Sequence, residues 1–190
     1  MEQRQDLIVG FDQSTRLVGF AVLDVSKTGQ PQRVESGVIE GKGGTRHGRY
    51  ASIRFQGRDL LAKYRGRIRS VAFEDGILYK EPKDPSKRNK MNPNTALWQA
   101  EARGILMGLA IDEHLPFEVY APTSVKKAAT GKGNSKKGQV AMFVTAFFGM
   151  AFAKEDEADA LAVALCHANH LHEEQVQQAL DDANGEQERG

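Results

Sequence analysis

The chain has 190 residues, 40% of them hydrophobic and 27% charged, a composition typical of one globular domain with a core of its own. No apolar run approaches the roughly 18 residues that span a membrane, and the amino terminus lacks the basic-then-apolar pattern of a secretion signal. A single cysteine, Cys166, rules out an intrachain disulfide framework. We therefore expect a soluble, cytoplasmic protein without a membrane partner.

The charge of the chain is unevenly distributed, although the net charge is only +1. Residues 154–190 carry ten acidic and two basic side chains, a charge of −8, so residues 1–153 carry +9. A phosphate-binding face can therefore exist, although a solvated mixed surface fits the charge equally well. Basic side chains are densest over residues 42–69, where a single acid, Asp59, stands among Lys42, Arg46, Arg49, Arg54, Arg58, Lys63, Arg65, Arg67 and Arg69.

Short apolar runs in the first half of the chain predict strands. The first ends at Asp12, and the four polar residues after it fit a hairpin loop that leads into the second strand. A later buried strand again ends on a carboxylate, Glu74. The predicted elements of this half are strands at 7–11, 17–25, 34–39 and 70–74, and a helix at 48–69.

The second half is predicted to be mainly helical. Residues 80–94 contain three prolines and five basic residues and predict a loop. The strongest predicted helix follows, with apolar positions on more than one stripe. The predicted elements of this half are helices at 95–114, 139–148 and about 155–172, a strand at 116–120, and a basic glycine-rich loop at 131–138.

The order of these elements predicts an α/β fold, with a central mixed sheet flanked by helices. We expect one domain over residues 1–173. The remaining residues, 174–190, are polar, acidic and end in glycine, and they predict a disordered tail.

Four carboxylates are candidates for one metal site. Asp12 and Glu74 each stand at the carboxyl end of a predicted buried strand, an edge that ligand sites in α/β sheets favour. Asp156 and Asp159 are three residues apart and share a face of the predicted last helix. Taken singly, each acid also fits a turn, a surface position or an acidic helix start.

Such a cluster would repel itself unless cations neutralised it, and hard oxygen ligands select Mg²⁺, with Mn²⁺ able to substitute. Two such ions about 4 Å apart activate a water and stabilise the leaving oxygen in phosphodiester cleavage. The pattern therefore favours a phosphodiester hydrolase.

Seven stretches of the chain resemble, in order, those of the RuvC-type Holliday junction resolvases, which have an RNase H-like fold with a five-stranded mixed sheet. The resemblance is greatest over the final acidic helix, Asp156 to Ala164. It implies a metal-dependent endonuclease that cleaves four-way junctions or other branched DNA and leaves a 5′-phosphate. The stretches are residues 8–12, 19–22, 72–74, 99–104, 119–126, 135–140 and 156–164.

The resemblance also implies roles for individual residues. Asp12, Glu74, Asp156 and Asp159 match the metal-binding acids. Lys126 and Lys137 match basic positions near the scissile phosphate, where a cation can stabilise developing charge, so Lys137 is a further catalytic candidate. Tyr79 lies near an aromatic position that stacks in the junction. The remaining candidates for contact with DNA backbones are Lys136, Arg46, Arg49 and Arg54.

One departure concerns the residues after Asp12, which are Gln13-Ser14, whereas bacterial members usually carry Pro-Gly. This is closer to the phage and viral branch, so the host is a bacterium or a phage-infected cell and the preferred branched substrate stays open. The acidic tail has no counterpart in the resemblance.

Two other sequence features each allow a second interpretation. The loop at 131–138 lacks the G-x-x-x-x-G-K-[ST] spacing of a nucleotide-binding loop and is interpreted as a DNA-backbone loop. His167, His170 and His172 lie close together in the sequence, but they have no cysteine or aspartate at a metal-site spacing. They are interpreted as ordinary core or surface histidines rather than as a metal site.

The sequence also allows two other functions, and it fits one kind of assembly. Gly10 to Thr15, with Gly19, also resembles the phosphate hairpin of actin-like ATPases and sugar kinases, although that fold needs about twice this length. A non-catalytic junction-binding protein on the same fold is the second alternative. The apolar breadth of the helix at 95–114 fits a homodimer, whose two-fold axis would match that of a four-way junction.

Overall fold

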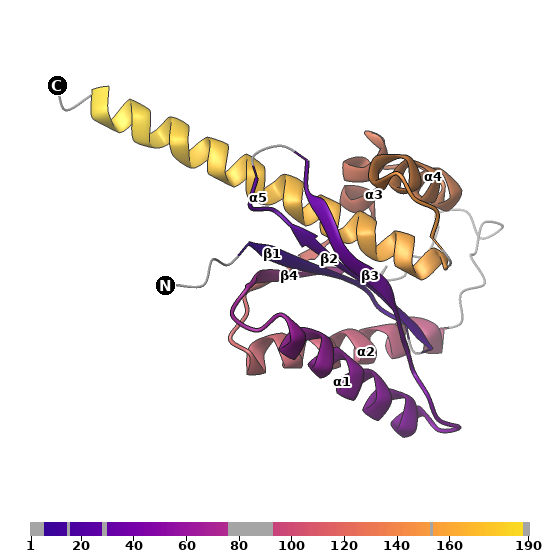
Figure 1. Cartoon of the computed structure of the whole chain (residues 1–190). Coiled ribbons are helices and arrows are strands. Elements are labelled where there is room, and N and C mark those ends of the chain that lie inside the picture. Colours follow the sequence, from indigo (N-terminus) through magenta and orange to yellow (C-terminus); the bar gives the residue numbers. More distant parts are fainter. Residues whose placement is uncertain (1–5, 15, 28–29, 76–92, 153, 188–190) are drawn as a thin grey trace.

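The structure, a computed structural model, describes residues 6–14, 16–27, 30–75, 93–152 and 154–187 (Figure 1). The described chain forms one sheet with helices packed on both of its faces. Its elements are β1 (Leu7–Asp12), β2 (Leu17–Asp24), β3 (Gln32–Glu40), α1 (Arg46–Lys63), β4 (Ile68–Glu74), α2 (Pro93–Asp112), β5 (Phe117–Tyr120), α3 (Pro122–Thr130), α4 (Lys137–Phe148) and α5 (Glu155–Gln187).

The sheet has five strands in the order β3-β2-β1-β4-β5. The first three strands form an antiparallel meander, and β4 and β5 add to β1 in parallel. β1 and β4 are therefore neighbours that run in the same direction, and the ladder between them ends at the pair Phe11 and Phe73. The predicted mixed five-stranded sheet is confirmed, and the ends of β1 and β4 lie at one edge of it.

Two layers of helices cover the two faces of the sheet. α1 and α2 lie on one face, and α3, α4 and α5 lie on the other (Figure 1). Because side chains alternate along a strand, Leu7 and Val9 of β1 pack toward α1 and α2, while Ile8 packs toward α5. β1 is buried on both sides, which explains its uninterrupted apolar sequence.

The first turns of α5 lie very close to β1 and β2, because both strands carry a glycine where the helix crosses them. A Cβ on Gly10 would stand 2.6 Å from the backbone nitrogen of Ala164, and a Cβ on Gly19 would overlap the carbonyl group of Asp156. Gly19 pairs directly with Asp12 across the hairpin. The two glycines therefore let the amino-terminal part of α5 approach the end of β1.

The last helix is longer than predicted. α5 continues to Gln187 instead of ending near His172, and its side chains are exposed from residue 172 to residue 184. Glutamate, glutamine, leucine and alanine are good helix formers, and Gln177 and Gln178 each donate to an aspartate four residues later. Neither α5 nor any other helix in the described part of the chain is long and apolar enough to cross a membrane. The division into a domain and a tail at residue 173 stays a prediction.

Two other elements differ from their predicted limits. α1 ends at Lys63, and the chain then turns into β4 at Ile68, so the predicted helix was too long at its carboxyl end. α3 was not predicted as a helix at all. It begins with Pro122 in its first turn and ends at Gly131, whose φ of 76° is a left-handed helix cap.

Candidate active site

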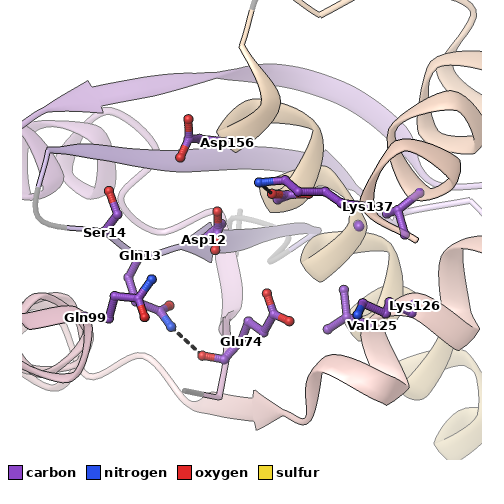
Figure 2. Close-up of a pocket in the computed structure, with 12 residues that line it drawn as sticks. Asp12, Gln13, Ser14, Glu74, Gln99, Val125, Lys126, Lys137 and Asp156 are labelled. Carbon is purple, nitrogen blue, oxygen red and sulfur yellow. Dashed lines mark hydrogen bonds and ion pairs between the residues drawn. The ribbon is translucent and has the colours of Figure 1, made fainter. Parts of the chain in front are cut away.

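Four acidic side chains surround a cavity of about 300 Å³ at the carboxyl ends of β1 and β4 (Figure 2). Asp12 is the last residue of β1 and Glu74 the last of β4. Asp156 and Asp159 come from the first turns of α5 and line the same cavity. The fold brings together the four acids that strand ends and helix spacing singled out.

The orientation of α5 separates its acids into two groups. Glu157 points away from the cavity toward β3, where its carboxylate accepts a hydrogen bond from Ser36 at 2.5 Å and lies 3.8 Å from Arg33. This contact and the two glycine crossings fix the rotation of the helix. Asp156 and Asp159 consequently face the cavity.

Burial and mutual repulsion raise the proton affinity of three acids of the cluster. Burial, and after it Asp159, Glu74 and Asp156 in that order, raise the pKa of Asp12 to about 7, while Lys137 opposes them. The pKa of Glu74 is also raised, first by burial and then by Asp159. Burial likewise raises the pKa of Asp159, although Lys137 acts against this change. A divalent cation would relieve this repulsion.

Lys137 supplies a positive charge inside the cluster. Its ammonium group lies 2.7 Å from Asp159 and 3.4 Å from Glu155. Burial alone would lower the pKa of Lys137, but these carboxylates and Asp12 raise it above its ordinary value, so the side chain stays charged. Lys126, from α3, lines the same cavity (Figure 2). Both predicted lysines are therefore at the site.

The end of β4 is held by residues that the sequence analysis did not select. The carbonyl oxygen of Glu74 accepts hydrogen bonds from the Gln13 side chain at 2.5 Å and from Arg103 of α2 at 3.2 Å. Arg103 also donates to Asp75 at 2.6 Å. The only sequence signal for these contacts is the position of Gln13 directly after Asp12.

The donor set suits a hard divalent cation, since it consists of carboxylate oxygens. In the described part of the chain, however, no three acidic, histidine or cysteine side chains already stand together as a closed ligand shell. The carboxylates surround the cavity and do not converge on one point. A bound cation would therefore have to draw them together.

The predicted DNA contacts are spread over the surface rather than gathered at the cavity. Lys136 immediately precedes α4 and Lys137. Arg46 and Arg54 lie on α1, across the sheet from α5, and each is more than half exposed with an acid of α2 3.7 to 4.0 Å away. Arg49 is partly buried, and its Nε atom has no partner among the described residues. The structure does not describe Tyr79.

Of the three α5 histidines, His167 is buried in the fold, whereas His172 is exposed. His167 is 1% exposed and lies between two hydroxyl groups, with Ser70 2.7 Å from its Nε2 and Tyr120 2.8 Å from its Nδ1. Burial first, and then His170 and Arg69, lower its pKa to about 4, so the ring is neutral at pH 7. His170 lies 3.3 Å from Glu174. Among the described residues, these histidines are not grouped as metal ligands.

A five-stranded mixed sheet, with carboxylates at two strand ends and on the final helix, defines a protein of the RNase H-like nuclease class. A family model described as crossover junction endodeoxyribonuclease RuvC matches residues 8–167. The chain belongs to this family, which confirms the predicted family and enzyme class. This match is evidence against the actin-like ATPase alternative.

Relatives and solved structures agree with this assignment. Proteins named crossover junction endodeoxyribonuclease RuvC from Campylobacter jejuni and Chromohalobacter salexigens are 34% and 33% identical, over 86% and 85% of this chain and 96% and 80% of their own lengths. The structure of T. thermophilus RuvC in complex with Holliday junction substrate has a TM-score of 0.72 and 25% identity, over 86% of this chain and 93% of that one. A yeast mitochondrial Holliday junction resolvase shares the fold, with a TM-score of 0.55 and 13% identity over 88% and 81% of the two chains.

Proposed function

We propose that this protein hydrolyses phosphodiester bonds in four-way junctions and other branched DNA, using Mg²⁺, for which Mn²⁺ can substitute. The observation that carries the proposal is the cavity where acids from β1, β4 and α5 meet. Burial first, and then repulsion from the other acids, raise the pKa of Asp12 to about 7, and a divalent cation is the natural partner for such a group. The relative whose structure contains a Holliday junction supports the choice of substrate.

In this proposal Asp12, Glu74, Asp156 and Asp159 hold the metal ions. When bound, such ions activate a water and stabilise the leaving oxygen of an in-line displacement. Lys137 has the charge and the position to attract the scissile phosphate, and its ion pairs keep it protonated. Lys126 adds a second cation at the same cavity. These two lysines compensate the negative charge of an approaching DNA backbone.

Contacts farther from the cut are proposed for Lys136 before α4 and for the α1 arginines Arg46, Arg49 and Arg54. Arg46 and Arg54 are exposed enough to exchange their acidic neighbours on α2 for phosphates. Tyr79 keeps its proposed stacking role in the junction. Phosphate contacts of this kind set orientation and affinity rather than sequence preference.

A homodimer and a cytoplasmic location complete the proposal. Leu97 and Ile111 of α2 and Phe55 of α1 are more than half exposed, which favours an apolar contact on this face of the sheet. A two-fold dimer would place two active sites on matching strands of a four-way junction. Light scattering of the complex should give the mass of the junction DNA plus two chains, and a mass with one chain only would contradict the dimer.

The decisive test is cleavage of synthetic four-way, three-way, flap and linear DNA side by side, with and without Mg²⁺. We expect metal-dependent cutting of the branched forms and little cutting of linear duplex. Asp156→Asn should reduce cutting by about a hundredfold or more, because it removes a charged oxygen ligand, while junction binding in a gel shift persists. Binding without cutting by the unmodified protein would favour the non-catalytic alternative.

A further inference from the structure

Gln13 is an amide side chain enclosed at the edge of the active-site cavity. It follows Asp12 directly and is only 5% exposed. Its Nε2 donates to the carbonyl oxygen of Glu74 at 2.5 Å, across 61 positions of sequence (Figure 2). A carbonyl oxygen only accepts hydrogen bonds, so the amide must turn its NH₂ group toward Glu74 and its Oε1 away.

This hydrogen bond links β1 and β4 beyond the last pair of their backbone ladder. The last paired residues are Phe11 and Phe73, so Asp12 and Glu74 lie one position past the ladder. The Gln13 side chain reaches the backbone of Glu74 at this position. It thereby ties together the chain segments that carry two of the four carboxylates.

The other end of the Gln13 amide is unsatisfied. Its Oε1 is enclosed and has no hydrogen-bond partner in the part of the chain that the structure describes. A buried acceptor without a donor lowers the stability of a fold, and an apolar side chain of the same length would avoid that cost. The amide is therefore better explained by its bond to Glu74 than by the stability of the fold.

We propose that Gln13 is a positioning residue that fixes Glu74 relative to Asp12, so that both carboxylates can bind the same divalent ion. The proposal rests on the metal site proposed above. Gln13 acts through the backbone of Glu74, which Arg103 also holds from α2. Loss of the Gln13 bond leaves Glu74 held by Arg103 of α2 and by its pairing with Tyr120 of β5, without this tie to the segment that carries Asp12.

The test is Gln13→Met, which keeps the length of the side chain and removes both polar atoms. Mn²⁺ affinity of the metal-free protein is measured by calorimetry, thermal unfolding without metal is measured in parallel, and junction cleavage is followed across metal concentrations. We expect Mn²⁺ affinity to fall about tenfold, as for other residues that orient metal ligands. The unfolding temperature should stay unchanged or rise, and cleavage should recover at high metal concentration.

Gln56→Met is the matched control. Gln56 of α1 also donates through Nε2 to a carbonyl at a strand end, that of Glu40 in β3, at 2.8 Å, but it lies away from the cavity. This variant should keep the Mn²⁺ affinity of the unmodified protein. It shows what the loss of such a bond does to stability alone.

Three results would overturn the inference. They are an unchanged Mn²⁺ affinity in Gln13→Met, an equal loss of affinity in both variants, and an unmodified protein that binds no Mn²⁺. If the unmodified protein binds Mn²⁺ but cuts no branched DNA, the proposed function fails instead. The ratio of affinities between Gln13→Met and the unmodified protein then still decides the role of Gln13.

Discussion

Asp12 is the acid of the cluster with the largest shift in pKa. Its pKa near 7 arises from burial first and from Asp159, Glu74 and Asp156 after that. A carboxylate of this kind binds protons and metal ions competitively. Lowering the pH below 7 should therefore weaken metal binding, and a metal ion should lower the pH at which Asp12 ionises.

Asp12→Asn in the absence of metal tests this shift in proton affinity. Because the folded pKa of about 7 lies above the ordinary value of 3.8, the stability that neutral Asp12 allows is present at low pH. It is lost as the pH rises from about 4 to 7. At pH 8 the variant should be more stable than the unmodified protein by about 4 kcal/mol, measured by urea unfolding. It should also lose Mn²⁺ binding. A destabilised variant at pH 8 would contradict the assigned repulsion.

For His167 we expect stability to depend on pH in the opposite direction, over nearly the same pH range. Its folded pKa of about 4 lies below the ordinary value of 6.5, because the ring is buried. Stability is therefore full above about pH 6.5 and falls as the pH decreases toward 4, by on the order of 3 kcal/mol. In His167→Gln this loss should vanish, although stability at pH 7 should drop, because Ser70 and Tyr120 lose a partner. Asp12 and His167 have opposite effects on the pH dependence of stability. Each effect must therefore be measured in its own single variant, because the unmodified protein alone would not separate them.

At the scale of elements, the site depends on how closely α5 approaches the hairpin of β1 and β2. Gly19 and Gly10 permit this approach, and Glu157 sets the rotation of the helix through Ser36. Two of the four carboxylates are thus placed by packing far more than by local sequence. Changes at these contacts should move the site without touching any acid in it.

Gly19→Ala tests this dependence. The new methyl group would overlap the backbone of Asp156, so the helix must shift away from β2. We expect destabilisation of about 1–3 kcal/mol and a drop in metal affinity together. Gly104→Ala on α2 is the control, because a methyl group there meets nothing within 4 Å; it should stabilise the protein by up to about 1 kcal/mol. Equal unfolding midpoints for the two variants would be incompatible with this packing.

Features of the structure that depend on local sequence could be predicted, whereas features that depend on long-range contacts could not. The apolar runs that end at Asp12 and Glu74, and the spacing of Asp156 and Asp159, are local patterns, and they singled out acids that the fold brings to one cavity. The Gln13 bond joins residues 61 positions apart, and no local pattern predicts it. α3 was missed because it spans only nine residues and begins with a proline, and such a short segment is hard to tell from a turn by its pattern. The extent of α5 was missed because its outer part has no core to pack against.

At the scale of the whole molecule, opposite charges are kept apart along the chain. The outer part of α5 projects from the body and carries acids on exposed positions (Figure 1). Residues 174–190 contain five acidic side chains and one basic side chain, so they contribute −4 of the net charge. These acids repel a DNA backbone, while the body attracts it.

Deletion of residues 174–190 should raise the net charge from +1 to +5 and strengthen DNA binding at low salt. The gain should disappear at high salt, where charges are screened, and fluorescence anisotropy with a labelled junction measures both conditions. Thermal unfolding should change little, because residues 174–184 are exposed. A full-length variant carrying Glu174→Gln, Asp181→Asn and Asp182→Asn separates charge from length. If that variant binds like the unmodified protein while the deletion binds tighter, length rather than charge is responsible.

α5 also connects the active site mechanically to the far end of the molecule. Its 33 residues form a rod of about 50 Å, at about 1.5 Å per residue, with Asp156 at one end and exposed positions such as Ala183 at the other. A tilt of this rod where it rests on Gly10 and Gly19 displaces its outer end much more than it displaces the carboxylates. A fluorophore at residue 183 would therefore report small movements of the metal ligands as large displacements. Energy transfer from it to a label on α1 can follow these displacements.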